Sequence, residues 1–223
     1  MAGPLLLSLK LASVVALLLL VVGVPAAYWL AFSRWRGKFL VESVVALPLV
    51  LPPTVLGYYA LVSMGARGAL GKLWIALFGH GLAFTFGGLV LASVLYSLPF
   101  AVQPLTAAFE GVDRKLLDAS AVLGAGKLRT FGRVILPLSI PGVVTAVVLS
   151  FAHTMGEFGV VLMVGGNIPG VTRTVSIEIY DQVQAANYAA ANQTALVLVM
   201  IAFAVLSLVY AVHRGAWNLW PWK

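Results

Sequence analysis

The chain has 223 residues, of which 61% are hydrophobic and 9% are charged, and its mean hydropathy is +1.02. A soluble domain of this length cannot bury so much apolar surface. The composition therefore excludes a soluble protein and predicts an all-α integral membrane protein with one membrane domain over residues 1–223. The absence of cysteine excludes disulfide bonds and thiolate metal sites.

Stretches without Asp, Glu, Lys or Arg indicate the spans, because a membrane-crossing helix needs about 20 apolar residues. We predict about five such helices. They cover residues 11–33, 43–66, 82–107, 134–156 and about 190–212. Gly79-His80-Gly81 interrupts the uncharged run before the third span, which predicts a short interfacial helix near 73–79. Counting that helix raises the total to six.

The basic residues predict the orientation, because lysine and arginine concentrate in cytoplasmic loops. With five spans, the 34–38 loop, the 110–133 loop and the C-terminal segment share one side and hold most of the 14 basic residues. This pattern predicts a multi-pass protein of the cell membrane with its N-terminus outside and its C-terminus in the cytoplasm. Residues 217–223, which are aromatic and basic, are expected at the cytoplasmic headgroup level. The net charge of +7 is therefore weak support for an anionic cargo.

Proline interrupts two predicted spans. Pro48, Pro52 and Pro53 lie in the second span, and Pro99 and Pro104 lie in the third. Each proline removes a backbone N–H donor, so these helices are expected to kink and to pack against other protein segments. Several kinks together favour a moving assembly rather than an inert membrane anchor.

The 110–133 loop contains an amphipathic segment. Asp113 can cap a helix over about 114–123, which would carry small and apolar side chains on one face at spacings of three and four. That face consists of Leu116, Ala119, Ser120 and Leu123. Gly124 then ends the helix. A short face with a leucine at each end suits insertion into a groove of another protein.

The spacing in this loop resembles the EAA loop of importer-type ABC transporter permeases: Glu-Ala-Ala, three residues, Gly, nine residues, then Ile-x-Leu-Pro. The matching positions are Asp118, Ala119, Ser120, Gly124, Val134, Leu136 and Pro137. Asp replaces Glu, Ser replaces the second Ala and Val replaces Ile, while the spacing is intact. The resemblance implies the type I importer permease fold, with Asp118 to Gly124 in a coupling helix that docks in a cytoplasmic ATPase subunit. An ordinary amphipathic loop is the alternative.

Three further segments, at 46–57, 153–159 and 165–174, are similar to the permease subunit of molybdate importers. In the third segment, the run Asn-Ile-Pro-Gly with Thr-Arg-Thr favours molybdate over the alternatives, which are sulfate/thiosulfate and tungstate permeases. The resemblance implies a subunit that forms the translocation path. Its implied partners are a second copy of itself, cytoplasmic ABC ATPase subunits, an external molybdate-binding protein and membrane lipid. The ATPase subunits would bind ATP and Mg, and this chain would bind no cofactor.

Glu157 and His153 are candidate gate or path residues at the end of the fourth span. A carboxylate at bilayer depth costs about 3 kcal/mol, so such residues usually face a cavity or a partner. A glutamate lining an oxyanion path would repel the cargo. We therefore predict that Glu157 accepts hydrogen bonds from the backbone or a neighbouring span, with His153 on the same helical face. The alternative is a carboxylate at the outer interface.

Three polar residues of the next outer segment, Asn167, Thr172 and Arg173, are further candidates. Asn167 and Thr172 offer N–H and O–H donors, which hold tetrahedral dianions well. Arg173 can pair with an acidic patch on a binding protein, and a solvated loop arginine is the alternative.

No Walker loop of the form Gly-x4-Gly-Lys-Ser/Thr occurs in the sequence, and no paired carboxylates or histidine cluster indicates a membrane enzyme or a metal site. We therefore expect a catalytically silent subunit, without metal or nucleic acid, in a complex that hydrolyses ATP. A more distant alternative is an ion-coupled secondary transporter, which needs intramembrane acids and inverted repeats. Glu157 is the single candidate acid for that class.

Overall fold

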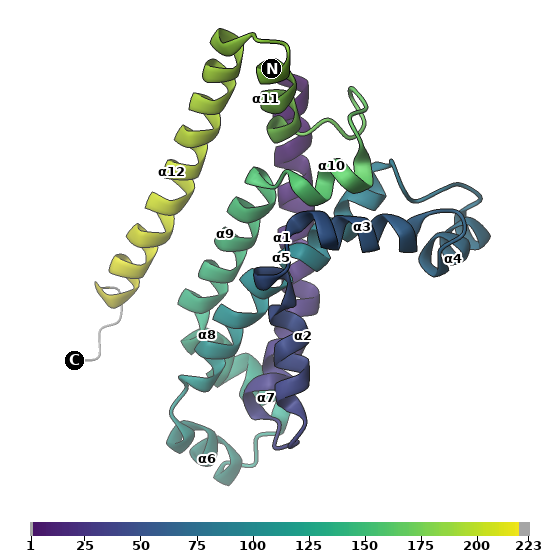
Figure 1. Cartoon of the computed structure of the whole chain (residues 1–223). Coiled ribbons are helices and arrows are strands. Elements are labelled where there is room, and N and C mark those ends of the chain that lie inside the picture. The colour runs from purple at the N-terminus through teal and green to yellow at the C-terminus, as the bar shows by residue number, and fades with distance from the viewer. Residues whose placement is uncertain (1, 219–223) are drawn as a thin grey trace.

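The computed structural model describes residues 2–218, and every regular element in this range is a helix (Figure 1). The elements are α1 Ala2–Phe32, α2 Lys38–Val50, α3 Pro53–Met64, α4 Ala69–Phe78, α5 Phe86–Glu110, α6 Arg114–Val122, α7 Lys127–Thr130, the π-helix η1 Phe131–Ile135, α8 Leu136–Leu138, α9 Ile140–Gly156, α10 Gly159–Gly165, α11 Val175–Gln184 and α12 Tyr188–Asn218. Most of the predicted headgroup segment at 217–223 lies outside the described residues.

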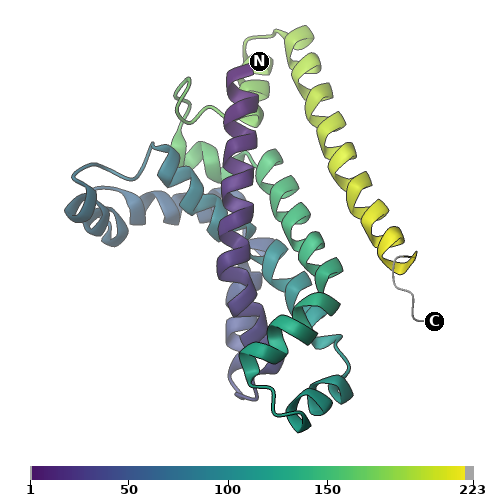
Figure 2. The same ribbon diagram turned by 180° about the vertical axis from the view of Figure 1, so that it is seen from behind.

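Three predicted spans are single helices, namely α1, α5 and α12, and each is long and apolar enough to cross a membrane. Helix α1 extends along the molecule on the face that Figure 2 presents. Two further spans are bent helix pairs, so the described part of the chain has three to five candidate membrane helices. The prediction of an all-α membrane protein with about five spans is confirmed at this level.

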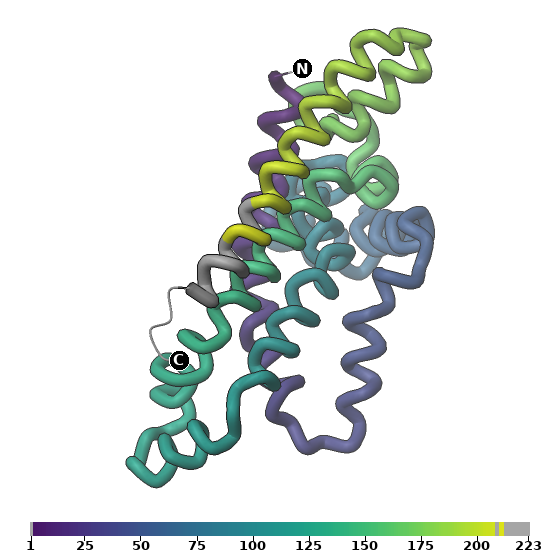
Figure 3. The backbone as a smooth tube through the Cα atoms, turned by 90° about the vertical axis from the view of Figure 1, so that its left-hand side faces the viewer, coloured from purple at the N-terminus to yellow at the C-terminus, as the bar shows by residue number. Residues whose placement is uncertain are grey.

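The predicted second span is not one continuous helix. Helices α2 and α3 meet at an angle of 111°, and Figure 3 shows α3 nearly end-on where α2 is seen from the side. Leu51 and Pro52 are both extended, with ψ of 138°, because a residue before proline is disfavoured in the helical region. Pro53 then starts α3, where a missing N–H costs little. The consecutive prolines therefore redirect the chain far more than a kink would.

The predicted fourth span also differs from the structure. Helix α9 begins only at Ile140, after a break at Ser139, and the segment from Lys127 to Leu138 lies at 73° to it. Ser139 is buried, and its hydroxyl donates to the Ala108 carbonyl of α5 at 3.3 Å. This contact ties the start of α9 to the end of α5.

The predicted interfacial helix near 73–79 is α4, which begins earlier than expected, at Ala69. It ends at Gly79, whose φ of +75° is readily adopted only by glycine. In Figure 1, α4 lies at the far end of α3, away from the bundle of long helices.

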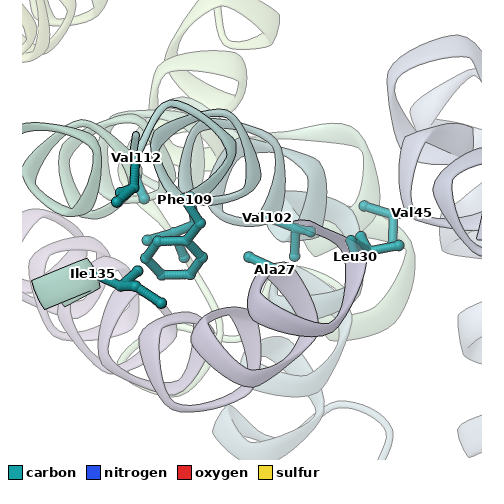
Figure 4. Packing of buried hydrophobic residues seen from close by; sticks show 9 residues of the cluster. Ala27, Leu30, Val45, Val102, Phe109, Val112 and Ile135 are labelled. Atoms are coloured by element: carbon teal, nitrogen blue, oxygen red, sulfur yellow. The ribbon is translucent and has the colours of Figure 1, made fainter. Parts of the chain in front are cut away.

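The core of the molecule lies where α1, α5 and α9 pack together. Phe109 of α5 is fully buried at the centre of one cluster, which Figure 4 shows. Its labelled members are Ala27, Leu30, Val45, Val102, Phe109, Val112 and Ile135. Gly142 lets α9 approach α5 closely, since a Cβ added there would lie 2.2 Å from the Ala108 Cβ. Small residues that permit such contact are typical of membrane helix interfaces.

A lysine joins three helix ends beside the 110–133 loop, which we call the connector. The Lys38 ammonium donates to the Leu30 carbonyl of α1 at 3.2 Å and lies 3.3 Å from Glu42 of α2 and 3.7 Å from Glu110 of α5. All three charged side chains are partly exposed, so each ion pair adds little stability by itself. Together they connect the ends of α1, α2 and α5 at the point where this loop leaves α5.

We expect Gly142→Ala to lower the thermal unfolding temperature of the purified protein in detergent, because the added methyl group overlaps Ala108. Overpacking of this kind costs about 1–3 kcal/mol. Gly132→Ala is the matched control, since a Cβ at Gly132 meets nothing within 4 Å. Equal unfolding temperatures for the two variants would show that α5 and α9 do not pack this closely.

Candidate functional site

The connector forms the short helix that the sequence predicts. Asp113 caps α6 by accepting a hydrogen bond from the Lys115 N–H at 2.9 Å. The helix ends at the Gly124 turn, where φ is +73° and the Ala125 N–H donates to the Ser120 carbonyl at 3.0 Å. Such a left-handed glycine satisfies carbonyls that a helix end would leave free. Aspartate and glycine therefore set both ends of α6 locally.

The predicted face of α6 lines one cavity of about 440 Å³. Leu116, Ala119, Ser120 and Leu123 share it with residues of the following segment, including Arg129 and Arg133. Asp118 is exposed and does not line it. The structure thus brings together four of the six predicted coupling residues, while Gly124 forms the turn.

A hydroxyl pair connects α6 to the segment after it. Ser120 is 9% exposed, and its Oγ lies 2.8 Å from Oγ1 of Thr130 in α7. Val122 and Leu123, by contrast, are 88% and 85% exposed. One side of α6 is therefore joined to the membrane helices while its apolar end is open to a partner. Sequence reasoning missed Thr130, because nothing in the local pattern pairs it with Ser120.

Glu157 caps a helix with its own side chain. It is 6% exposed, and its carboxylate oxygens accept the N–H groups of Val160 at 2.6 Å and Val161 at 3.1 Å. These donors are free N–H groups at the start of α10, where a negative charge is favourable. The carboxylate therefore satisfies α10 from within the protein and is not exposed at an interface.

Helix α10 packs tightly against α3. A Cβ at Gly57 of α3 would lie 2.7 Å from the Met163 Cβ, and a Cβ at Gly159 of α10 would lie 2.7 Å from the Pro53 Cβ. Each helix thus contributes one glycine to a reciprocal close contact. Glu157 therefore holds α10 in the position from which it supports α3.

His153 does not pair with Glu157. Its Nδ1 lies 2.9 Å from the Ser97 Oγ of α5, and its ring stacks on Phe100 at 4.0 Å between centroids. Ser97 also lies 3.0 Å from the Thr154 hydroxyl. The expected common face fails because α9 ends at Gly156 and Glu157 turns toward α10. Ser97 was missed because it is 56 residues from His153 in the sequence.

Arg173 and Asn167 belong to a polar network in the outer segment. Arg173 donates to the Asn167 side-chain oxygen at 2.6 Å and lies 3.4 Å from both Glu178 and Asp181. Asn167 in turn donates to Asp181 at 2.6 Å. The carboxylates of α11 therefore pair with Arg173 within this chain, while its side chain stays partly exposed.

Thr172 has a structural place in the same segment. It is fully buried, and its hydroxyl donates to the Gly165 carbonyl at 2.7 Å and accepts the Ile168 N–H at 3.1 Å. In this structure the single donor of Thr172 is used within the segment, so its expected contact with an oxyanion stays a prediction.

The sequence of the chain matches a family model over residues 20–217, described as the inner membrane component of binding-protein-dependent transport systems. The chain belongs to this family. The match covers both bent helix pairs and the whole connector, so it includes the unusual parts of the fold as well as the apolar helices.

Curated relatives resemble this permease over nearly its whole length. The molybdenum transport system permease protein ModB of Azotobacter vinelandii is 54% identical over 208 residues, which cover 93% of this chain and 92% of the relative. The protein of the same name from Escherichia coli K12 is 43% identical over 204 residues, covering 92% and 89%.

Solved structures of importers share the fold of this permease. An inward-facing structure of the MetNI methionine ABC transporter superposes with a TM-score of 0.76 at 16% identity, covering 96% of this chain and 95% of that chain. A bacterial ABC transporter that imports alginate gives a TM-score of 0.72 at 15% identity, covering 94% and 78%. At these identities the likeness establishes the fold alone.

Proposed function

We propose that this chain is the membrane-spanning subunit of an ATP-driven importer of molybdate. The observation that carries the proposal is the 54% and 43% identity to two molybdenum transport permeases over nine-tenths of the chain. The capped connector helix with its exposed apolar end supports a role beside a separate ATPase subunit. The chain itself hydrolyses nothing in this proposal, and ATP and Mg belong to the partner.

Uptake of radiolabelled molybdate tests the cargo. Cells that lack their own molybdate importer should accumulate the label when they express this chain with its ATPase subunit and binding protein. Excess unlabelled molybdate should abolish uptake, while the same excess of sulfate should leave most of it. Inhibition by sulfate equal to that by molybdate would favour the sulfate permease alternative.

In this proposal α6 is the coupling helix. Val122 and Leu123 enter a groove of the ATPase subunit, and the Ser120–Thr130 contact passes its motion to α7 and the segment leading to α9. A second copy of the chain completes the translocation path, because five spans are few for a full pathway.

Leu123→Asp should abolish copurification with the ATPase subunit and lower ATP-dependent uptake at least tenfold, because it places a charge on the docking end of α6. Leu123 is 85% exposed, so the fold should tolerate the change. Val171→Asp makes the same kind of change at an exposed site in the outer segment and should leave copurification intact. Loss of the ATPase in both variants, or in neither, would contradict the assignment of α6.

Helices α3 and α10 form the gate in this proposal, and Glu157 holds it together. The Glu157→Gln variant keeps the size of the side chain but turns an NH2 group toward a backbone N–H. The unsatisfied donor costs about 1–3 kcal/mol. We expect slower uptake with normal copurification of the ATPase subunit. Uptake by the variant at the wild-type rate would contradict a gating role for Glu157.

Orientation is proposed with α6 in the cytoplasm. The 33–37 loop and α6 lie at one end of the molecule, and the N-terminus and α11 lie at the other (Figure 1). This arrangement agrees with the clustering of basic residues in loops of one side.

Cysteine labelling can test the orientation cleanly, because the natural sequence has no cysteine. In intact cells a membrane-impermeant maleimide should label Val171→Cys and should label Asp118→Cys only after permeabilisation. Both positions are exposed in the structure. The reverse pattern would invert the proposed topology.

A further inference from the structure

A narrow groove lies between α1 and the segment that follows α6. Its volume is about 340 Å³, which is within the range of small-molecule sites. Six residues line it: Val24, Pro25, Tyr28, Lys127, Leu128 and Phe131. Figure 2 shows α1 on the near face of the molecule. The groove is distinct from the cavity behind α6 and has no part in the proposed docking of the ATPase.

Aromatic side chains form the back wall of the groove. The Tyr28 ring meets the Phe131 ring edge-on at 5.4 Å between centroids, and Phe131 meets the buried Phe109 at 5.8 Å. Phe131 is therefore held from both sides. Leu128 forms the rim and is 86% exposed. An apolar groove with such a rim is unfavourable in water and favourable for a hydrocarbon chain.

The groove lies beside the membrane surface. Trp29 and Trp35 are 6.0 Å apart near the end of α1 and are 42% and 55% exposed. Exposed tryptophan is typical of the headgroup level of a bilayer. Val21, one turn before Pro25, is 72% exposed, as expected for a lipid-facing position. The part of α1 that lines the groove therefore lies between a lipid-facing residue and tryptophans typical of the headgroup level.

Lys127 is the one charged residue among the six that line the groove, and because the lining is almost wholly apolar, it borders the groove with the methylene groups of its side chain. Among residues 2–218, no carboxylate lies within ion-pair distance of its ammonium group. A lysine that borders an apolar groove with its methylene groups can extend its ammonium group to a negative headgroup outside, so such a groove matches an anionic amphiphile.

We propose that this groove binds one anionic phospholipid, with an acyl chain against Tyr28 and Phe131 and the phosphate on Lys127. The assignment to the inner leaflet rests on the proposed orientation, while the site itself does not depend on the cargo. The lipid would bridge α1 and α7, the helix that follows the coupling helix.

Native mass spectrometry of the complex with its ATPase subunit tests the site, using palmitoyl-oleoyl phosphatidylglycerol against the zwitterionic phosphatidylcholine with the same chains. We expect one phosphatidylglycerol to bind preferentially. Lys127→Gln should weaken that binding about fivefold, since a basic residue near anionic lipid contributes about 1 kcal/mol. Lys127→Arg should retain it. Arg36→Gln, which removes an exposed charge from the neighbouring 33–37 loop, is the matched control.

Crosslinking locates the acyl chain. A phosphatidylglycerol with a diazirine on its acyl chain should label peptides containing residues 24–28 and 128–131 more than the exposed face of α12. Equal affinity for the two lipids, equal loss in Lys127→Gln and Arg36→Gln, or even labelling along α12 would overturn the proposal. Binding to the isolated chain but not to the complex would also overturn it, because a protein partner would then cover the groove. None of these results depends on molybdate uptake.

Discussion

A helix that begins inside the apolar body of a membrane protein has backbone N–H groups in its first turn that water cannot reach. The protein itself must supply acceptors for them. This permease breaks its helices repeatedly, at the two prolines after α2, at Ser139 and at Glu157. The Glu157 carboxylate meets the requirement at α10, where it accepts two N–H groups from a position that is 6% exposed. At this break the irregular backbone therefore has an internal hydrogen-bond partner.

Close glycine contacts turn these capped ends into a connected unit. Gly57 and Gly159 allow α3 and α10 to touch at backbone distance, and Gly142 does the same for α9 and α5. Because these contacts are tightly packed, movement of one helix is expected to displace its neighbour. Ser139, buried between α5 and α9, and the Ser120–Thr130 contact continue the connection toward α6. A path of packed elements thus runs from the exposed connector to α3.

The outer segment is organised by a different kind of interaction. Polar side chains form a network here, namely Arg173, Asn167 and the two carboxylates of α11. These side chains are partly exposed, so each ion pair by itself adds little stability. The buried Thr172 hydroxyl connects this segment back to the end of α10. The segment is thereby held in one shape by its own residues.

The sequence by itself determined the features that depend on short-range chemistry. Apolar run length predicts α1, α5 and α12, while Asp113 and Gly124 set the ends of α6 because caps act within one turn. Tertiary structure decided the rest. The 111° turn after α2, the partnership of His153 with Ser97 and the pairing of Arg173 with α11 each depend on segments that meet only when the helices pack. Local sequence shows that the Glu157 carboxylate needs hydrogen-bond partners. Which groups these are depends on the turn of the chain after α9, which brings the N–H groups at the start of α10 to the carboxylate.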